Sequence, residues 1–454
     1  MGMAMQGKAA VVSLGCAKNL VDSEVLAAQL TRLGYEITAE ASEAALIVVN
    51  TCGFLASAVQ EAVDHLLEMA RYKDEGSCRH LVAVGCMVQR YGRKLVSLLP
   101  EVDLFLGTSH YDRFADLLEK FIQEGTPTIL LERPGYLYHG AIQRIPSTPA
   151  HWAYVKIAEG CSNRCSFCLI PTLRGPCRSR TVQDVVAEVQ HLAQSGVVEV
   201  NLIAQDTTAF GTDRGEPNAL CQLLEALEDI SGLRWVRLLY TSPFGVHDDL
   251  LRTMAGSSKV VPYLDIPFQH CVPRILEAMH RRGERLRPLK LIERIRKHLP
   301  DVALRTSLMV GFPGETEADF QDLCRFVKDV RFDHMGVFAF SSERGCRAAR
   351  LADPVAEEVK QARRDALMAL QQSISRAKLQ RLVGRHLPIL VEGLHSETEF
   401  LAVGRLPTQA PEVDGCVLIV EGEAVAGDIV QAEILKTHDY DLEARLLTPV
   451  AHGP

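Results

Sequence analysis

The stretch EGCSNRCSFCLIP, residues 159–171, places Cys161, Cys165 and Cys168 in a CxxxCxxC spacing at the end of the apolar run AYVKIAEG. Three thiolates this close together can wrap one [4Fe–4S] cluster within a loop, and they leave the fourth iron without a protein ligand. An open iron can bind a substrate or a cofactor. The alternative is a zinc loop whose fourth ligand is Cys177 or a distant residue, although structural zinc usually binds to paired CxxC units.

Around this loop the sequence alternates between strand-like and helix-like segments. Amphipathic stretches such as TVQDVVAEVQHLAQSG (181–196) separate the apolar runs. Six strand–helix repeats predict an α/β domain, a partial or open (βα)6 barrel, in which the carboxyl ends of the strands form the active face. The expected strands lie at residues 153–160, 198–205, 235–241, 263–268, 303–312 and 334–340.

Polar residues at two of these strand ends are candidates for cofactor contacts. Gln205 and Asp206 follow the run 198–205, and Arg305 and Thr306 are expected at the carboxyl end of another strand. Arg305 could clamp a carboxylate through a two-pronged contact. Each of these side chains could equally be a structural polar group.

A second set of cysteines lies in the N-terminal part of the chain. From Lys8 to about Glu132 the same alternation predicts βα units and a parallel sheet, and Cys16, Cys52 and Cys86 each lie just beyond a predicted strand. If these strands are neighbours, the three thiols emerge at one edge of the sheet and could hold a second cluster with one open iron. The alternative is three buried cysteines that pack as small hydrophobic residues. The turn-forming neighbours in GCAKN, NTCGF and VGCMV favour a ligand loop.

The remaining segments complete the expected organisation. The Pro- and Gly-containing residues 133–150 predict a linker, and a charged helix is expected from about residue 353 to 385. Four short strands with glycine turns then predict a small antiparallel β-barrel. We therefore expect an N-terminal cysteine domain at residues 8–132, a central domain at 151–377 and a barrel at 378–446.

Composition limits the class of protein. The 454 residues are 47% hydrophobic and 23% charged, which is typical of a globular protein of two to four domains. No window of 18 uncharged apolar residues and no secretory signal are found, so we expect a cytoplasmic protein without a membrane span. The net charge of −8 argues against a chain built mainly to bind nucleic-acid phosphates. No heptad or apolar interface stripe is seen, so a monomer is expected.

The thirteen cysteines also bear on the compartment. An odd number in a reducing compartment argues against a disulfide framework and for metal ligation or thiol chemistry at some of them. Seven of them lack partners at ligand spacing and are interpreted as structural: Cys78, Cys177, Cys221, Cys271, Cys324, Cys346 and Cys416.

Together these motifs resemble the methylthiotransferase family of the radical S-adenosylmethionine superfamily along nearly the whole chain. The resemblance implies a C-terminal TRAM barrel, S-adenosylmethionine as cofactor, and Phe167 as an aromatic cover for the cluster or the adenine. It places an open iron that binds the cofactor at Cys161, Cys165 and Cys168. The first [4Fe–4S] cluster would be held by Cys16, Cys52 and Cys86.

Four stretches resemble the branch of this family that modifies an aspartate of small-subunit ribosomal protein S-twelve. They are SLGCAKNLVDSE (13–24), HWAYVKIAEGCSNRC (151–165), YLDIPFQH (263–270) and APEVDG (410–415). The sister MiaB branch modifies adenosine in tRNA and typically has GCQMN where this chain has GCAKN. The chain departs from the family pattern at Cys346, where relatives more often have a small or hydroxyl residue. That departure puts in doubt any role carried over to this loop.

Charge helps to choose between the two substrates. Residues 386–445 contain twelve acidic residues against three basic ones, which would repel RNA phosphates and attract a basic ribosomal protein. A merely solvated acidic surface is the alternative. We expect a protein substrate, a reductant such as flavodoxin or ferredoxin, and no direct binding of nucleic acid.

The chemistry itself requires a radical, because the C–H bond at an sp³ carbon is too weakly acidic for a side-chain base. The hypothesis is that a deoxyadenosyl radical removes hydrogen from the aspartate β-carbon, and that sulfur from the first cluster, methylated by a second S-adenosylmethionine, is added there. A tRNA methylthiotransferase and a non-enzymatic iron–sulfur sensor or scaffold are the rivals.

Overall fold

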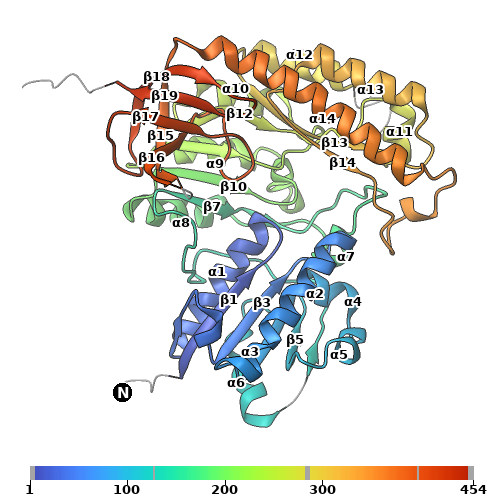
Figure 1. Ribbon diagram of the computed structural model, residues 1–454, viewed down its shortest axis with the longest axis vertical. Helices are drawn as coiled ribbons and strands as arrows, with labels where there is room; N and C mark the ends of the chain where they lie inside the picture. Colours follow the sequence, from blue (N-terminus) through green and yellow to red (C-terminus); the bar gives the residue numbers. More distant parts are fainter. Residues whose placement is uncertain (1–5, 126–127, 282–286, 396–397, 448–454) are drawn as a thin grey trace, which may run out of the picture.

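The computed structural model describes residues 6–125, 128–281, 287–395 and 398–447. The chain forms three bodies (Figure 1): an N-terminal βα domain, a central open α/β barrel above it, and a small closed barrel beside the central strands. No helix among the described residues is long and apolar enough to span a membrane.

The N-terminal domain is a six-stranded parallel sheet with the order β2-β1-β3-β4-β5-β6. Every residue of β3 is buried, as is typical of parallel strands covered on both faces. The sequence missed β2 and β6 because each has only two or three residues. The strands are β1 (Gly7–Ser13), β2 (Tyr35–Ile37), β3 (Leu46–Thr51), β4 (His80–Gly85), β5 (Leu104–Leu106) and β6 (Ile129–Leu130), and the helices are α1 (Ala17–Arg32), α2 (Ala56–Ala70), α3 (Tyr72–Glu75), α4 (Cys86–Tyr91), α5 (Lys94–Leu98) and α6 (Phe114–Glu124).

The central domain has the six predicted strands in the order β14-β13-β12-β11-β10-β7, all parallel. In the described part of the chain the edge strands β7 and β14 are not paired, so the barrel is open. A hairpin of β8 (Ala158–Glu159) and β9 (Arg178–Ser179) with the short helix α7 (Ile170–Leu173) frames the CxxxCxxC loop. The strands are β7 (Trp152–Lys156), β10 (Glu199–Ile203), β11 (Trp235–Leu238), β12 (Val260–Asp265), β13 (Ala303–Val310) and β14 (His334–Ala339), and the helices are α8 (Val182–Gln194), α9 (Ala219–Leu227), α10 (Asp248–Gly256), α11 (Pro273–Ala278), α12 (Pro288–His298) and α13 (Glu317–Val330).

The C-terminal barrel is closed by five strands in the order β15-β16-β17-β19-β18. The expectation of a wholly antiparallel barrel is wrong at one pair, because β17 and β19 run parallel. The sequence also missed β19, which closes the ring. The strands are β15 (His386–His395), β16 (Thr398–Arg405), β17 (Val417–Glu421), β18 (Ile429–Thr437) and β19 (Leu442–Leu446).

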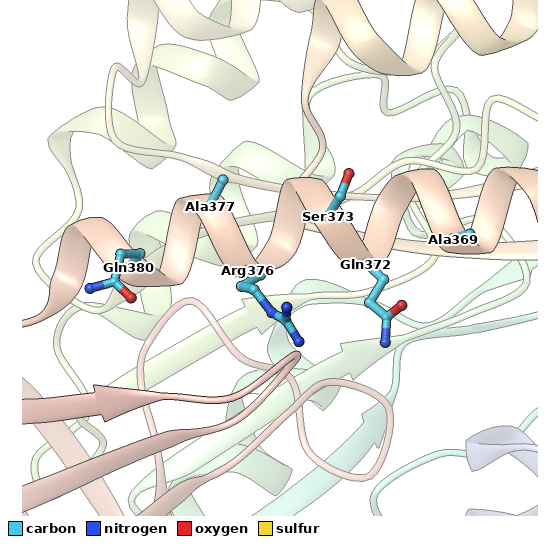
Figure 2. Close-up of a pocket in the computed structure, with 6 residues that line it drawn as sticks. All are labelled: Ala369, Gln372, Ser373, Arg376, Ala377 and Gln380. Atoms are coloured by element: carbon cyan, nitrogen blue, oxygen red, sulfur yellow. The ribbon is translucent and has the colours of Figure 1, made fainter.

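The long helix α14 (Glu357–Leu379) connects the central domain to this barrel and is shorter than predicted. Asp353 has φ +56°, a left-handed conformation that a helix cannot contain, so the helix begins after it. A pocket runs along α14, and Figure 2 shows Gln372 and Arg376 pointing from the helix on its lower side. Both side chains donate hydrogen bonds to Asp439 of the barrel, with Gln372 Nε2 lying 2.6 Å and Arg376 Nε 2.8 Å from its carboxylate.

The segment 131–151 contains no helix or strand, as expected for a connection, but it is packed rather than free. Tyr136 and Tyr138 are buried in the N-terminal core. Arg144 forms ion pairs with Glu24 of α1 and with Glu188 of α8. The segment therefore joins the two domains through buried contacts.

A buried ion pair holds the C-terminal barrel against the central strands. Glu199 of β10 is fully buried between Arg237 of β11 (3.0 Å) and Arg405 of β16 (2.6 Å). Burial alone raises the pKa of the Glu199 carboxyl, but Arg405 and Arg237 outweigh this and lower it. The two domains are thus linked by a carboxylate that stays charged at neutral pH.

We expect Glu199→Gln to lower the free energy of unfolding by roughly 3 kcal/mol, because two buried guanidinium groups lose their counter-charge. Since the folded-state pKa lies below the ordinary 4.5, the wild-type contribution is present above pH 4.5 and is lost as pH falls through the folded-state value. Thermal melting at pH 7 and under acid conditions measures both effects. Glu421→Gln, at an exposed position of the same barrel, is the control and should melt like wild type. Equal melting temperatures for the two variants would contradict the assignment.

Candidate functional site

The three N-terminal cysteines lie together at the carboxyl ends of neighbouring strands β1, β3 and β4, as the sequence predicted. Cys16 directly precedes α1, Cys52 follows β3 without a gap, and Cys86 is the first residue of α4. Gly15 has φ +98°, and a Cβ atom there would lie 3.1 Å from the Cys52 sulfur. Burial raises the pKa of Cys52, and the nearby Cys16 raises it further. Only glycine therefore allows this loop to pass so close to the thiol.

The CxxxCxxC loop forms a second thiol group in the central domain. Burial raises the pKa of Cys161 to about 11 and that of Cys168 to about 12, and the neighbouring Cys165 raises both further. The backbone N–H of Ile170 donates to the Cys168 sulfur at 3.4 Å, and Arg281 Nη1 donates to the Cys165 sulfur at 3.7 Å. The thiols of Cys161 and Cys168 are therefore protonated at neutral pH until a metal ion binds and displaces their protons.

The donor chemistry of both thiol groups fits iron–sulfur clusters. Within the described ranges, no three His, Cys, Asp or Glu side chains converge closely enough to hold a single metal ion. Cys16 and Cys52 nevertheless raise the pKa of Cys86, and Cys165 and Cys161 raise that of Cys168, so the thiols of each group are neighbours in space. Cys86, Cys165 and Cys168 also accept hydrogen bonds from N–H groups, the kind of contact that tunes cluster sulfurs.

Arg174, a residue of the central domain, reaches into the N-terminal thiol group. It is buried, and its Nε lies 3.2 Å from the Cys86 sulfur. Its Nη1 donates to Asp22 of α1 at 2.6 Å and to Glu159 at 3.3 Å, and its Nη2 donates to Asn19. This one guanidinium therefore connects a thiol of the first group with the segment that carries the second.

Lys156 and Gln205 complete the network around Arg174. The ammonium group of Lys156 pairs with Asp22 and, at 2.9 Å, with Glu159, while Gln205 Nε2 donates to Glu159 at 2.6 Å. Burial would raise the pKa of Glu159, but Lys156 and Arg174 outweigh it and lower the pKa to about 2. This network was not predicted from the sequence. The only local signal was that Glu159 and Arg174 flank the cysteine loop.

Of the polar candidates for cofactor contacts, Gln205 lies at a strand end as predicted and Arg305 does not. Gln205 lies two residues beyond β10, as predicted, and its Oε1 is buried without a hydrogen-bond partner among the described atoms. The expected position of Arg305 is wrong: it is the third residue of β13, because this strand extends to Val310. Its guanidinium lies 3.5 Å from Asp265 and 3.3 Å from Asp414, so it already contacts two carboxylates of the protein.

Phe167 and Cys346 lie next to the second thiol group. The Phe167 side chain packs against an apolar cluster that includes Ile275 and Met279, and its carbonyl oxygen accepts a hydrogen bond from the Cys346 thiol at 3.1 Å. Cys346 is buried against Cys86, Leu169 and Leu173. Cys346 therefore lies beside a cysteine of the first group and contacts the loop that carries the second group.

Three family models match successive parts of the chain. Residues 8–107 match an uncharacterized protein family, UPF0004, residues 155–327 match the radical SAM superfamily, and residues 383–447 match the TRAM domain. The matches follow the three bodies of the fold in order.

Curated relatives match almost the full length. A "Ribosomal protein uS12 methylthiotransferase RimO" of Syntrophobacter fumaroxidans is 56% identical over 97% of this chain and 98% of its own. Proteins of the same name from Anaeromyxobacter sp. strain K and Geobacter sulfurreducens are 47% and 45% identical, over 96% and 97% of this chain and 92% and 99% of theirs.

Among solved structures, the radical S-adenosylmethionine methyltransferase TsrM of Kitasatospora setae, with cobalamin and a [4Fe–4S] cluster bound, has a TM-score of 0.56. It is 15% identical, over 74% of this chain and 75% of that one. The cobalamin-dependent radical enzyme OxsB has a TM-score of 0.52 at 10% identity, over 81% of this chain and 56% of that one. At these identities the likeness concerns the fold.

Proposed function

This chain belongs to the family of ribosomal protein uS12 methylthiotransferases, which are radical S-adenosylmethionine enzymes, and from that premise we propose that it transfers a methylthio group to the β-carbon of an aspartate in ribosomal protein uS12. The observation that carries the proposal is the pair of thiol groups on two domains, joined by Arg174. Each group leaves one corner of a four-iron cluster free, which suits one site for a cofactor and one for sulfur.

We assign one [4Fe–4S] cluster to Cys161, Cys165 and Cys168 and another to Cys16, Cys52 and Cys86. When bound and reduced, the former supplies the electron that splits S-adenosylmethionine into methionine and a 5′-deoxyadenosyl radical. The residues of this chain would hold the clusters through their thiolates and orient the loops that carry them. Ile170 and Arg281 donate to sulfurs of the central group, and Arg174 donates to Cys86. Cys16 is exposed, so a substrate could approach the first group from this side.

The charge of the C-terminal barrel supports a protein substrate less strongly than its composition indicates. Several of its acidic residues contact other parts of the protein, including Glu412, Asp414 and Asp439. Others pair within the barrel, as Glu433 does with Arg445. The outward-facing acidic excess is therefore smaller than the twelve-to-three ratio, and the choice between a basic protein and tRNA requires a direct experiment.

The experiment is anaerobic turnover of reconstituted enzyme with S-adenosylmethionine, sulfide and a reductant, with uS12 and unmodified tRNA offered in parallel. We expect mass spectrometry to show one methylthio group on an aspartate of uS12 and unchanged tRNA. Activity on uS12 should also depend less steeply on salt than binding to nucleic acid does. Modification of tRNA alone would contradict the proposed substrate and favour an adenosine methylthiotransferase.

A further inference from the structure

Lys18 is a buried cation beside the first thiol group. It lies in the first turn of α1, two residues after Cys16, and only 7% of it is exposed. Its Nζ lies 3.2 Å from the centre of the Tyr240 ring, which belongs to the central domain just beyond β11. The ammonium group is therefore located where the N-terminal thiols meet the central barrel.

The nearest carboxylate influence on this ammonium group is that of Asp265, which acts on it from beyond ion-pair distance. In the described part of the chain, no Asp or Glu oxygen lies within 4.0 Å of Lys18 Nζ. Lys156, which is buried more deeply, pairs with both Asp22 and Glu159. Arg281, another buried cation near thiols, donates to the carbonyl of Pro267 at 2.6 Å. The close contact that the structure shows for the Lys18 ammonium group is the face of the Tyr240 ring. This contact leaves N–H groups of Lys18 available to donate hydrogen bonds to a ligand.

Two features of the fold disfavour a cation at this position. Taking an ammonium group out of water without a counter-charge is costly. The N-terminus of a helix carries partial positive charge, and the first turn of α1 has no acidic residue to offset it. Burial opposes the charge, but Tyr240, Cys16 and Asp265 outweigh it and raise the pKa of Lys18. The side chain is therefore held as an ammonium group, which attracts an anion that enters this site.

The backbone of Tyr240, whose ring contacts Lys18, has a strained conformation. Tyr240 has φ +59°, which is rare for a bulky residue, and its backbone N–H donates to Asp265 at 2.9 Å. Asp265 also lies 3.5 Å from Arg305, so its carboxylate is shared between that guanidinium and the more distant Lys18. Backbone strain of this kind is concentrated at ligand sites, where the surrounding structure maintains it.

We propose that the Lys18 ammonium group binds the carboxylate of the target aspartate and thereby selects an acidic side chain. This inference rests on the proposed function. The carboxylate of aspartate is bonded directly to its β-carbon, so a cation that holds the carboxylate also places the reacting carbon within one bond of it. Cys16 is exposed and its charge acts on Lys18, so a β-carbon held at Lys18 would lie near the first thiol group. Lys18 is thus a specificity-determining residue.

The test is a double-mutant cycle between Lys18 and the substrate carboxylate. Reconstituted full-length wild type and Lys18→Met are compared for binding of uS12 and of uS12 in which the modified aspartate is asparagine. Methionine preserves the unbranched shape and removes the charge. We expect the substitution to weaken binding of the aspartate form at least tenfold and to change binding of the asparagine form less than twofold. Lys18→Arg should recover part of the preference. Iron content and substrate-independent 5′-deoxyadenosine formation should match wild type.

Lys8→Met is the matched control, because Lys8 is an exposed lysine of the same domain that pairs with Glu43. The inference is overturned if Lys18→Met keeps the wild-type preference for aspartate, or if it loses iron, which would indicate a structural role. In either case, modification of uS12 by wild type would leave the proposed function standing. Failure of wild type to modify uS12 would overturn both.

Discussion

Cys52→Ala is expected to abolish methylthio transfer completely while leaving cleavage of S-adenosylmethionine at the wild-type rate. Cys52 belongs to the first thiol group, next to Cys16, and it contributes nothing to the loop that carries Cys161, Cys165 and Cys168. A cluster held by three thiolates should not survive the loss of one. The measurements are iron and sulfide per chain, 5′-deoxyadenosine by chromatography and modified uS12 by mass spectrometry. Iron should fall by about half.

Two further variants separate the roles of the cysteines. Cys78→Ala removes a buried thiol of the same domain, one that lies 3.4 Å from the carbonyl of His80, and it should keep both activities. Cys165→Ala should lose both activities, because the radical chemistry precedes transfer. Loss of 5′-deoxyadenosine formation in Cys52→Ala would show that the two thiol groups do not divide the work as assigned.

Arg174→Met should produce the largest loss of stability among single substitutions at this site, roughly 5 kcal/mol. The change leaves Asp22 and Glu159 buried with only Lys156 to neutralise them, and it removes the donors to Cys86 and Asn19. An unpaired buried charge is far more costly than a missing surface contact. Thermal melting and limited proteolysis at the boundary between the first two domains measure the effect.

The control is Arg71→Met, since Arg71 is exposed and pairs with Glu75 one turn away, a contact worth about 0.5 kcal/mol or less. It should melt within a degree or two of wild type. If Arg174→Met melts at the same temperature as Arg71→Met, the buried network does not join the domains and the described role of Arg174 is wrong.

Local pattern was sufficient for most of the strands and for placing Cys16, Cys52 and Cys86 just beyond strand ends. Cys52 and Cys86 could be placed at strand ends because alternation of apolar and amphipathic segments depends on neighbouring residues. Short elements such as β19, and the parallel pairing of β17 with β19, depend on partners far along the chain and were missed. Arg305 was placed at the wrong end of β13 because periodicity locates a strand more reliably than its boundaries.

The fold class and the order of the three bodies follow from local pattern, because they depend on residue types within a few positions of one another. The pairing of charges is visible only in the folded chain. Arg174 contacts Asp22 across 152 residues of chain, Glu199 contacts Arg405 across 206, and Lys18 lies over the Tyr240 ring of another domain. The energy of an ionic group depends on its burial and on its partner, and both arise only when distant segments pack together.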